Sequence, residues 1–125
     1  MSSEKLTRFA NEKYLSLETY RKNGSPVATP VWFAEDGGVF YIYSLINAGK
    51  VKRIRNNSHV RVAPCDMRGK LTGEFVDAEA RILDRAGEEK GHRLLNQKYG
   101  LLKRIGDFMS KLRKRERAVI AIEIR

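Results

Sequence analysis

Short β-patterned segments separated by glycine turns limit most strongly what this chain can fold into. The first third of the sequence holds three runs rich in β-branched and aromatic residues, separated by KNGS at 22–25 and EDGG at 35–38. Asn-Gly is a strong hairpin signal, because asparagine and glycine both tolerate positive φ values. We therefore expect strands over 14–21, 26–34 and 39–44, joined as an antiparallel meander.

Three more strands are expected farther along the chain, over 59–66, 71–84 and 117–125. In the middle one, small or branched apolar residues alternate with charged ones, which is typical of a strand with one face in a core. The alternation assigns to the inner face Val76, Ala78, Ala80 and Ile82.

Short helices interrupt this strand order. They are expected at 3–13, at 48–56 with Asn47 as the N-cap, and in an amphipathic region over 86–113. Six mostly antiparallel strands with short helices predict a mainly β fold. We expect a small closed or partly closed barrel with the helices packed at its ends.

The composition agrees with one globular domain over residues 1–125. Hydrophobic residues make up 42% of the chain, which is enough for a core. The single cysteine, Cys65, excludes an internal disulfide, and neither a signal segment nor an apolar stretch of membrane-spanning length is found. We expect a cytoplasmic protein without a membrane partner.

The net charge of +10 favours anionic ligands, from nucleic acid to phosphorylated or carboxylated small molecules.

The stretch SLINAGKVKRIRNN, residues 44–57, concentrates positive charge. Two apolar residues within it, Val51 and Ile54, share a helix face that would pack against the core. Around them stand four basic residues, Lys50, Lys52, Arg53 and Arg55. Three interpretations are open: a solvated basic face, a nucleic-acid patch, or a pocket for a specific anion.

Helix geometry gives the anion pocket its physical basis. Helix N-termini bind phosphate, whereas a lysine in the first turn opposes the helix dipole unless an anion is bound. Lys50 lies in that turn, and Arg53 lies three residues on, on the same face. The preceding strand would bring the hydroxyl group of Ser44 near the start of the helix.

The segment ATPVWF, residues 28–33, is a second candidate for ligand binding. Proline removes a hydrogen bond from a sheet, so Pro30 belongs at an edge or a bulge. A bulge would free main-chain groups of Pro30, Val31 and Trp32 to bond the edge of a ligand. The alternative for Trp32, the single tryptophan, is a core or dimer-interface position.

A further basic cluster follows the amphipathic region and comprises Lys111, Arg113, Lys114, Arg115 and Arg117. Such charges are favourable at a helix C-terminus, or they contact nucleic acid. No zinc ligands, RNP aromatics or clear helix-turn-helix accompany them in the sequence, so nucleic acid is the weaker hypothesis.

The sequence offers few side chains for catalysis without a cofactor. His59 and His92 are the two histidines, and neither has a metal-ligand spacing with Cys65, so we expect no metal. The sequence contains no GxSxG, GxGxxG or P-loop motif. A cofactor would therefore carry any reaction.

The ordered set of segments resembles the pyridoxamine 5′-phosphate oxidase-like split barrels, over about residues 12–125. The resemblance is carried by TPVWF at 29–33, by the aromatic strand that follows, and by the pattern S-x5-K-x3-[IL]-x2-[ND] that runs from Ser44 to Asn57. Within these proteins it looks closest to the flavin- and deazaflavin-dependent oxidoreductases, which use FMN or coenzyme F-420.

This resemblance implies a fold and an assembly. The expected fold is a six-stranded antiparallel split β-barrel, which forms a homodimer with the cofactor in a groove shared by the two subunits. Main-chain groups of Pro30, Val31 and Trp32 would line the isoalloxazine or deazaflavin ring.

The resemblance also implies a phosphate site. Tyr43 and Ser44 would lie near the ribityl chain and the phosphate, Lys50 would bind the phosphate, and Arg53 would assist. Flavin-using oxidases of this superfamily often carry Ser-Arg-Lys here, whereas this chain has Ala48-Gly49-Lys50.

The function implied is hydride transfer between the cofactor and a small unsaturated acceptor, with no side chain assigned as catalytic. The chain lacks the C-terminal substrate segment of pyridoxamine phosphate oxidases, so that activity is not expected. The alternatives are a cofactor-binding or carrier module without turnover and, less favoured, a basic nucleic-acid-binding protein.

Overall fold

The structure is a computed structural model that describes residues 7–10, 12–45, 48–83, 93–94, 97–98 and 117–124. These residues form seven strands and the helix α2. The elements are β1 Tyr14–Tyr20, β2 Pro26–Trp32, β3 Ala34–Asp36, β4 Val39–Leu45, α2 Gly49–Asn56, β5 His59–Cys65, β6 Val76–Ile82 and β7 Arg117–Ile124. The strands form one antiparallel sheet in the order β2-β1-β5-β6-β7-β4-β3.

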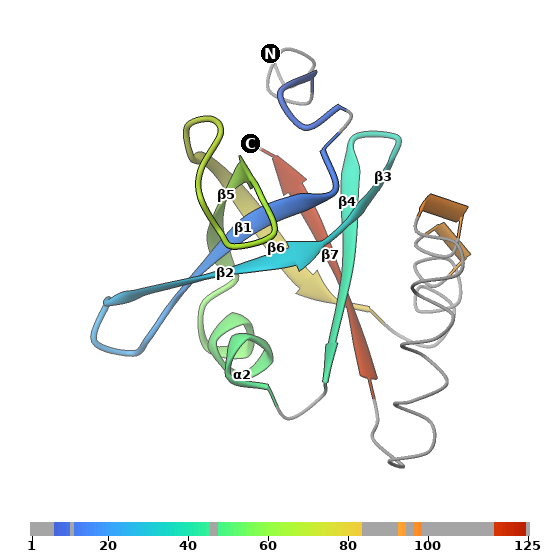
Figure 1. The fold of residues 1–125 in the computed structure, drawn as a ribbon. Coiled ribbons are helices and arrows are strands. Elements are labelled where there is room, and N and C mark those ends of the chain that lie inside the picture. Colours follow the sequence, from blue (N-terminus) through green and yellow to red (C-terminus); the bar gives the residue numbers. More distant parts are fainter. Residues whose placement is uncertain are drawn as a thin grey trace.

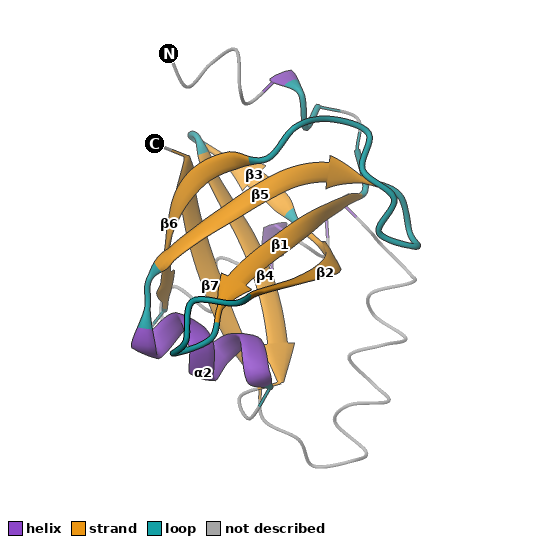
Figure 2. Cartoon of the chain, turned by 90° about the vertical axis from the view of Figure 1, so that its left-hand side faces the viewer, coloured by secondary structure: helices purple, strands orange, loops and turns teal. Residues whose placement is uncertain are grey.

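The two edge strands of this sheet are consecutive in the chain, and a single residue, Phe33, joins them. Since β2 and β3 lie at opposite edges, the sheet has to curl until these edges meet at Phe33. Figures 1 and 2 show the resulting curled half-barrel, with α2 across one end. The fold is thus mainly β, as expected from the sequence.

The corner at Phe33 corrects two sequence-based expectations. The strand expected over 26–34 ends at Trp32, and a separate strand, β3, takes Ala34 together with Glu35 and Asp36, which were expected in the turn. The sheet therefore has seven strands and not six. The expected meander is also wrong, since β2 pairs with β1 whereas β4 pairs with β3 and β7. The physical reason is burial, because Phe33 is only 1% exposed and its ring packs against Phe9 and Phe40.

The glycine turns lie where the sequence predicts them. Gly24 ends the turn between β1 and β2 with a φ of 88°, and Gly37 and Gly38 join β3 to β4 with φ values of 61° and 86°. The Gly24 N–H donates to the carbonyl oxygen of Arg21 at 2.8 Å, which closes the first hairpin. Positive φ favours glycine at these positions.

The core lies inside the curl of the sheet. The inner face predicted for β6 is confirmed, with Val76, Ala78 and Ala80 buried and Ile82 packed against the core. In β7 the residues of both faces are buried, because Val119 and Ala121 pack with Tyr41 in a second, smaller cluster. That cluster also includes Leu94, which lies in the helical pair 93–94.

Several element boundaries differ from the sequence-based ones, most of all at the start of β6. β6 begins at Val76 instead of at position 71, and Leu71 forms only an isolated bridge with Cys65. The segment before β6 packs closely on β5, since a Cβ atom built on Gly73 would stand 2.7 Å from Pro64 Cγ. The helix begins at Gly49 with Ala48 as its N-cap residue.

The expected cap Asn47 is wrong, because the helix begins one residue later and Ala48 is the N-cap residue. Outside the described residues lie residues 3–6 of the first helix, most of the helical region 86–113, and the basic residues 111–115. The helix expected over 3–13 is wrong for its described second half, because residues 8–10 form a turn and residues 12–13 are not helical.

Within the described ranges, no helical segment has both the length and the apolar character that a membrane span requires.

Replacement of Phe33 by alanine tests the importance of the corner. Because the ring is buried against Phe9 and Phe40, Phe33→Ala is expected to lower the free energy of unfolding by about 3 kcal/mol or more. Urea denaturation gives this value, with Met67→Ala as the control because Met67 is 67% exposed. Equal losses in the two variants would contradict this account of the corner.

Candidate functional site

Helix α2 turns two of its basic side chains toward the protein and two toward solvent. Val51 and Ile54 are buried, which fixes the rotation of the helix as predicted. Its basic residues divide accordingly, with Lys50 and Arg53 partly buried and with Lys52 and Arg55 exposed. Lys50 and Arg53 therefore differ from a uniformly solvated basic face.

Among the described residues, no side chain caps the N–H groups in the first turn of α2. The N-cap residue is Ala48, whose side chain cannot accept a hydrogen bond, and no acidic residue lies in the first turn. The carbonyl oxygen of Ala48 accepts from Val51 and Lys52 at 3.1 and 3.3 Å. Lys50, the second helical residue, adds its charge to an N-terminus that is already partly positive.

The guanidinium group of Arg53 bends back over the start of the helix. A Cβ atom built on Gly49 would stand 2.7 Å from Arg53 Nη1, so the guanidinium occupies the space beside Gly49. Its Nε–H donates to the hydroxyl oxygen of Thr19 at 2.6 Å. Thr19 lies near the end of β1 and is only 1% exposed.

Lys50 and Arg53 each lie close to another positive charge. Burial, and then the charge of Arg53, lowers the pKa of Lys50, while burial, and then Arg21, lowers the pKa of Arg53. Among the described residues, neither Lys50 nor Arg53 forms an ion pair with a carboxylate. A phosphate or carboxylate ligand would supply the missing negative charge.

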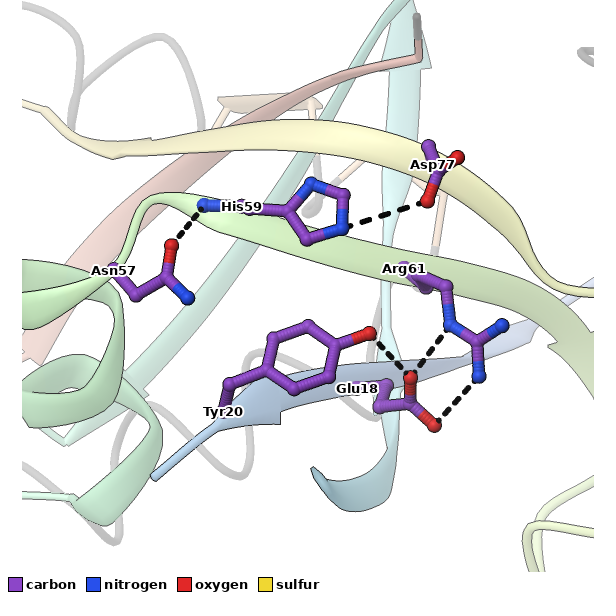
Figure 3. Close-up of polar contacts among 6 residues, drawn as sticks. All are labelled: Glu18, Tyr20, Asn57, His59, Arg61 and Asp77. Atoms are coloured by element: carbon purple, nitrogen blue, oxygen red, sulfur yellow. Dashed lines mark hydrogen bonds and ion pairs between the residues drawn. The ribbon is translucent and has the colours of Figure 1, made fainter. Parts of the chain in front are cut away.

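The acidic residue next to Thr19 in sequence faces away from this cluster. Glu18 points to the opposite face of β1, where both of its oxygens accept from Arg61, at 2.6 and 3.2 Å (Figure 3). The Tyr20 hydroxyl donates to the same carboxylate at 2.6 Å. The hydrogen bond from Arg61 is the main cause that lowers the pKa of Glu18.

The other residues of the predicted phosphate site are placed less fully. Ser44 is partly buried in β4, the strand that precedes α2. Tyr43 pairs with Val119 of β7, and its side chain lies outside the described part of the structure. Thr19 was missed in the sequence analysis. The sole signal in the sequence is the alternation along β1, which places Thr19 on the same inward face as Leu15 and Leu17 and so directs its hydroxyl group inward.

Pro30, Val31 and Trp32 lie on β2, an edge strand of the described sheet, which confirms the edge position predicted for Pro30. The bulge alternative is wrong, since the pairing of β2 with β1 is continuous from Trp32 to Pro26. Val31 is buried in the core, whereas Pro30 is exposed. Trp32 is partly exposed, with its ring centroid 6.4 Å from that of Tyr14.

The predicted phosphate site (Lys50 and Arg53) and the predicted ring site (Pro30, Val31 and Trp32) lie toward opposite ends of β1. Thr19 contacts Arg53, whereas Pro30 and Trp32 pair with Ser16 and Tyr14. Along a strand, these separations from Thr19 amount to about 10 and 17 Å. The two sites could thus hold the anionic end and the flat end of one elongated ligand.

A pocket of about 480 Å³ lies near the ring site and is lined by Arg8, Pro64, Thr72, Gly73 and Glu74. The register places it there, because Leu15 pairs with Val31 on one side and with Pro64 on the other. The turn at Gly69 also approaches this end, since a Cβ atom built on Gly69 would stand 3.6 Å from Pro30 Cδ.

The side chains usually associated with metal or nucleophilic chemistry serve other roles. His59 stacks on Tyr20 and pairs with Asp77 at 3.5 Å (Figure 3). Cys65 is buried, and burial is the main cause that raises the pKa of its thiol to about 11. No group of metal-ligating side chains occurs within the described ranges.

The Glu18–Arg61 pair generates a prediction about stability. Glu18 has a side chain that is 8% exposed, so Arg61→Leu leaves a buried carboxylate unpaired and is expected to cost about 2 kcal/mol at pH 7. The lowered pKa of Glu18 stabilises the wild type above pH 4.5, and this contribution is lost as the pH falls through that pKa.

The difference between wild type and Arg61→Leu should therefore shrink below pH 4.5, the ordinary pKa of the carboxyl group. Arg81→Leu is the matched control, because its pair with Glu123 is exposed and is expected to contribute about 0.5 kcal/mol or less. Urea denaturation at several pH values measures both. An equal, pH-independent loss in the two variants would rule out a special role for Glu18.

Comparisons with solved structures support the fold. An FAD-binding protein from Mesorhizobium loti superposes with a TM-score of 0.70 at 17% identity, covering 100% of this chain and 88% of that one. A protein described as an F420 reductase gives 0.59 at 20% identity, with 95% and 91% covered. The heme storage protein HutZ from Vibrio cholerae gives 0.71 at 16% identity, with 98% and 89% covered. At such identities the similarity shows the fold alone.

Comparison with protein families identifies the chain more closely. Among curated proteins, none matches this sequence. The family profile described as pyridoxamine 5′-phosphate oxidase, in contrast, matches residues 2–125. This match spans nearly the whole chain, so the protein belongs to the pyridoxamine 5′-phosphate oxidase family.

Proposed function

We propose that this protein binds a phosphorylated flavin or deazaflavin, FMN or coenzyme F-420, and transfers a hydride between it and a small unsaturated acceptor. The observation that carries the proposal is the pair Lys50 and Arg53 at the start of α2, for which the described part of the chain offers neither an acidic partner nor a side-chain cap. Family membership supports it, since relatives in fold include an FAD-binding protein and an F420 reductase.

The donors present suit a phosphate group. Lys50 supplies a flexible ammonium, Arg53 supplies a planar guanidinium beside Gly49, and the first N–H groups of α2 lie at the same end of the helix. Ser44, on the strand before the helix, is the candidate for a hydroxyl contact. The distance of about 10 to 17 Å along β1 leaves room for a linker between the phosphate and the ring.

The role of the chain in the reaction is to bind and orient. A flavin or deazaflavin ring supplies the hydride-transfer chemistry when it is bound. Main-chain groups of Pro30, Val31 and Trp32 at the sheet edge would fix the ring, and Lys50 and Arg53 would fix the phosphate. Holding both ends sets the ring against the acceptor and excludes water from that face. No side chain is assigned a catalytic role.

Charge bears on the choice between the two cofactors. Coenzyme F-420 carries a poly-glutamate tail as well as a phosphate, and a chain with a net charge of +10 suits such a polyanion. We propose that the protein acts in the cytoplasm as a homodimer, with the cofactor in a groove between the two subunits. The edge strand β2 is the part of the described sheet that such a groove would use.

A module that binds the cofactor without turnover is the second candidate, and the likeness in fold to a heme storage protein keeps it open. It predicts the same binding but no reduction of any acceptor. Nucleic-acid binding is less favoured, because two of the four basic residues of α2 turn toward the protein.

Cofactor binding tests the proposal directly. Lys50→Met keeps most of the side-chain volume but removes the charge, and should weaken the binding of FMN or coenzyme F-420 at least about tenfold. Fluorescence titration measures the change. The matched control is Lys52→Met, on the same helix but exposed, which should bind as the wild type does. Absence of binding to either cofactor by the wild type would refute the proposal.

Without ligand, the same substitution should stabilise the protein. Lys50 opposes the helix dipole and the charge of Arg53, so Lys50→Met is expected to raise the free energy of unfolding by about 0.5 kcal/mol near pH 7. Because the pKa of Lys50 is lowered on folding, the unfolded state binds more protons as the pH approaches 10.5. The advantage of Lys50→Met should therefore shrink at high pH. A destabilised Lys50→Met would show that Lys50 has a structural role instead.

A further inference from the structure

The position of the Arg53 guanidinium depends on two other residues, Thr19 and Gly49. Thr19 lies far from Arg53 in the sequence, and Gly49 has no side chain. An arginine side chain has many rotamers. Because Lys50 and Arg21 repel its charge, Arg53 would be expected to extend into solvent, away from them. In this structure the guanidinium instead bends back toward the start of its own helix. Something has to hold it there against the repulsion.

Thr19 provides the attachment. Its hydroxyl oxygen accepts the Nε–H of Arg53 at 2.6 Å, and the threonine itself lies in β1, where it pairs with Val27 of β2. The bond joins residues 34 positions apart, so it links the barrel wall to the helix. It uses one of five guanidinium N–H donors, which leaves the four on Nη1 and Nη2 for other acceptors.

Gly49 provides the space. Helical side chains tilt toward the N-terminus, so Arg53 at position i+4 lies directly above residue 49. A Cβ atom on Gly49 would stand 2.7 Å from Arg53 Nη1 and 3.5 Å from Cζ. The backbone does not require glycine here, because Gly49 is not among the described glycines with positive φ. The missing side chain at 49 is therefore explained by the guanidinium that takes its place.

We infer that Thr19 is a positioning residue that, with the space left by Gly49, holds Arg53 beside Lys50 as the second phosphate-binding cation of the site. This inference rests on the proposed function. A preorganised guanidinium can contact two phosphate oxygens at once, and it loses little side-chain freedom when the ligand arrives. An arginine in solvent would lose that advantage.

Three substitutions remove one part of this arrangement each. Thr19→Val keeps the shape of the side chain and removes the acceptor, whereas Thr19→Ser keeps the acceptor. Gly49→Ala displaces only the end of a flexible side chain, so the fold should be retained, and alanine favours the helix. Arg53→Ala removes the guanidinium itself, and Lys52→Ala is the exposed control.

The experiment compares a phosphorylated ligand with its phosphate-free counterpart, for example FMN and riboflavin, by fluorescence titration. Thr19→Val and Gly49→Ala should each weaken FMN binding about tenfold and leave riboflavin binding unchanged, while Thr19→Ser and Lys52→Ala bind as the wild type does. In the double variant Thr19→Val with Arg53→Ala, the loss should equal that of Arg53→Ala alone, since both act through one group. If coenzyme F-420 is the ligand, its phosphate-free chromophore replaces riboflavin.

The possible failures are distinguishable. A wild type that binds no cofactor refutes the proposed function and this inference together. If Lys50→Met loses FMN but Thr19→Val and Gly49→Ala keep it, the function stands and the inference is wrong. Equal losses of FMN and riboflavin in a folded Thr19→Val would also overturn it, because the threonine would then support the fold of the whole site. Thermal unfolding of each variant identifies any that fail to fold.

Discussion

The single-residue connection between the two edge strands is the constraint on which the rest of this structure depends. Because Phe33 joins β2 to β3, the sheet cannot stay open, and its curl creates both an enclosed core and an end that a helix can cover. Helix α2 covers that end and inserts Val51 and Ile54 into the core. The rotation set by these two residues decides which basic side chains approach β1.

The charge arrangement that follows is unfavourable without a ligand. Lys50 and Arg53 stand at a helix N-terminus whose dipole has the same sign, and the acid next to Thr19 is held by Arg61 on the opposite face of the strand. Proteins commonly retain such local instability at binding sites, where a ligand removes it. In the proposed function, Lys50, Arg53 and the N–H groups at the start of α2 would bind a phosphate with little rearrangement.

Local features of this fold could be predicted from the sequence, whereas the pairing of distant segments could not. Asn23-Gly24 and Gly37-Gly38 mark their turns, and Val51 and Ile54 identify the buried face of α2, because these signals act over a few residues. The corner at Phe33 gives no such signal, since the β pattern continues through it from Val31 to Ala34. Which strand each half joins depends on partners far along the chain.

The same distinction applies to the candidate site. Lys50 and Arg53 could be identified from helical spacing, but Thr19 could not, because a threonine in a strand is ordinary and its bond spans 34 positions. The chain also lacks the arginine that flavin-using oxidases of the superfamily often carry at position 49. Only the structure shows that the guanidinium of Arg53 stands in that space.

The central claim is that Lys50 and Arg53 bind the phosphate of the cofactor. The most direct measurement is the ³¹P NMR spectrum of FMN or coenzyme F-420 with wild type and with Lys50→Met, at protein concentrations that saturate binding. The account predicts a shifted phosphorus resonance with the wild type and a resonance close to that of the free ligand with Lys50→Met. A bound cofactor whose phosphorus resonance is the same with both proteins would contradict the claim.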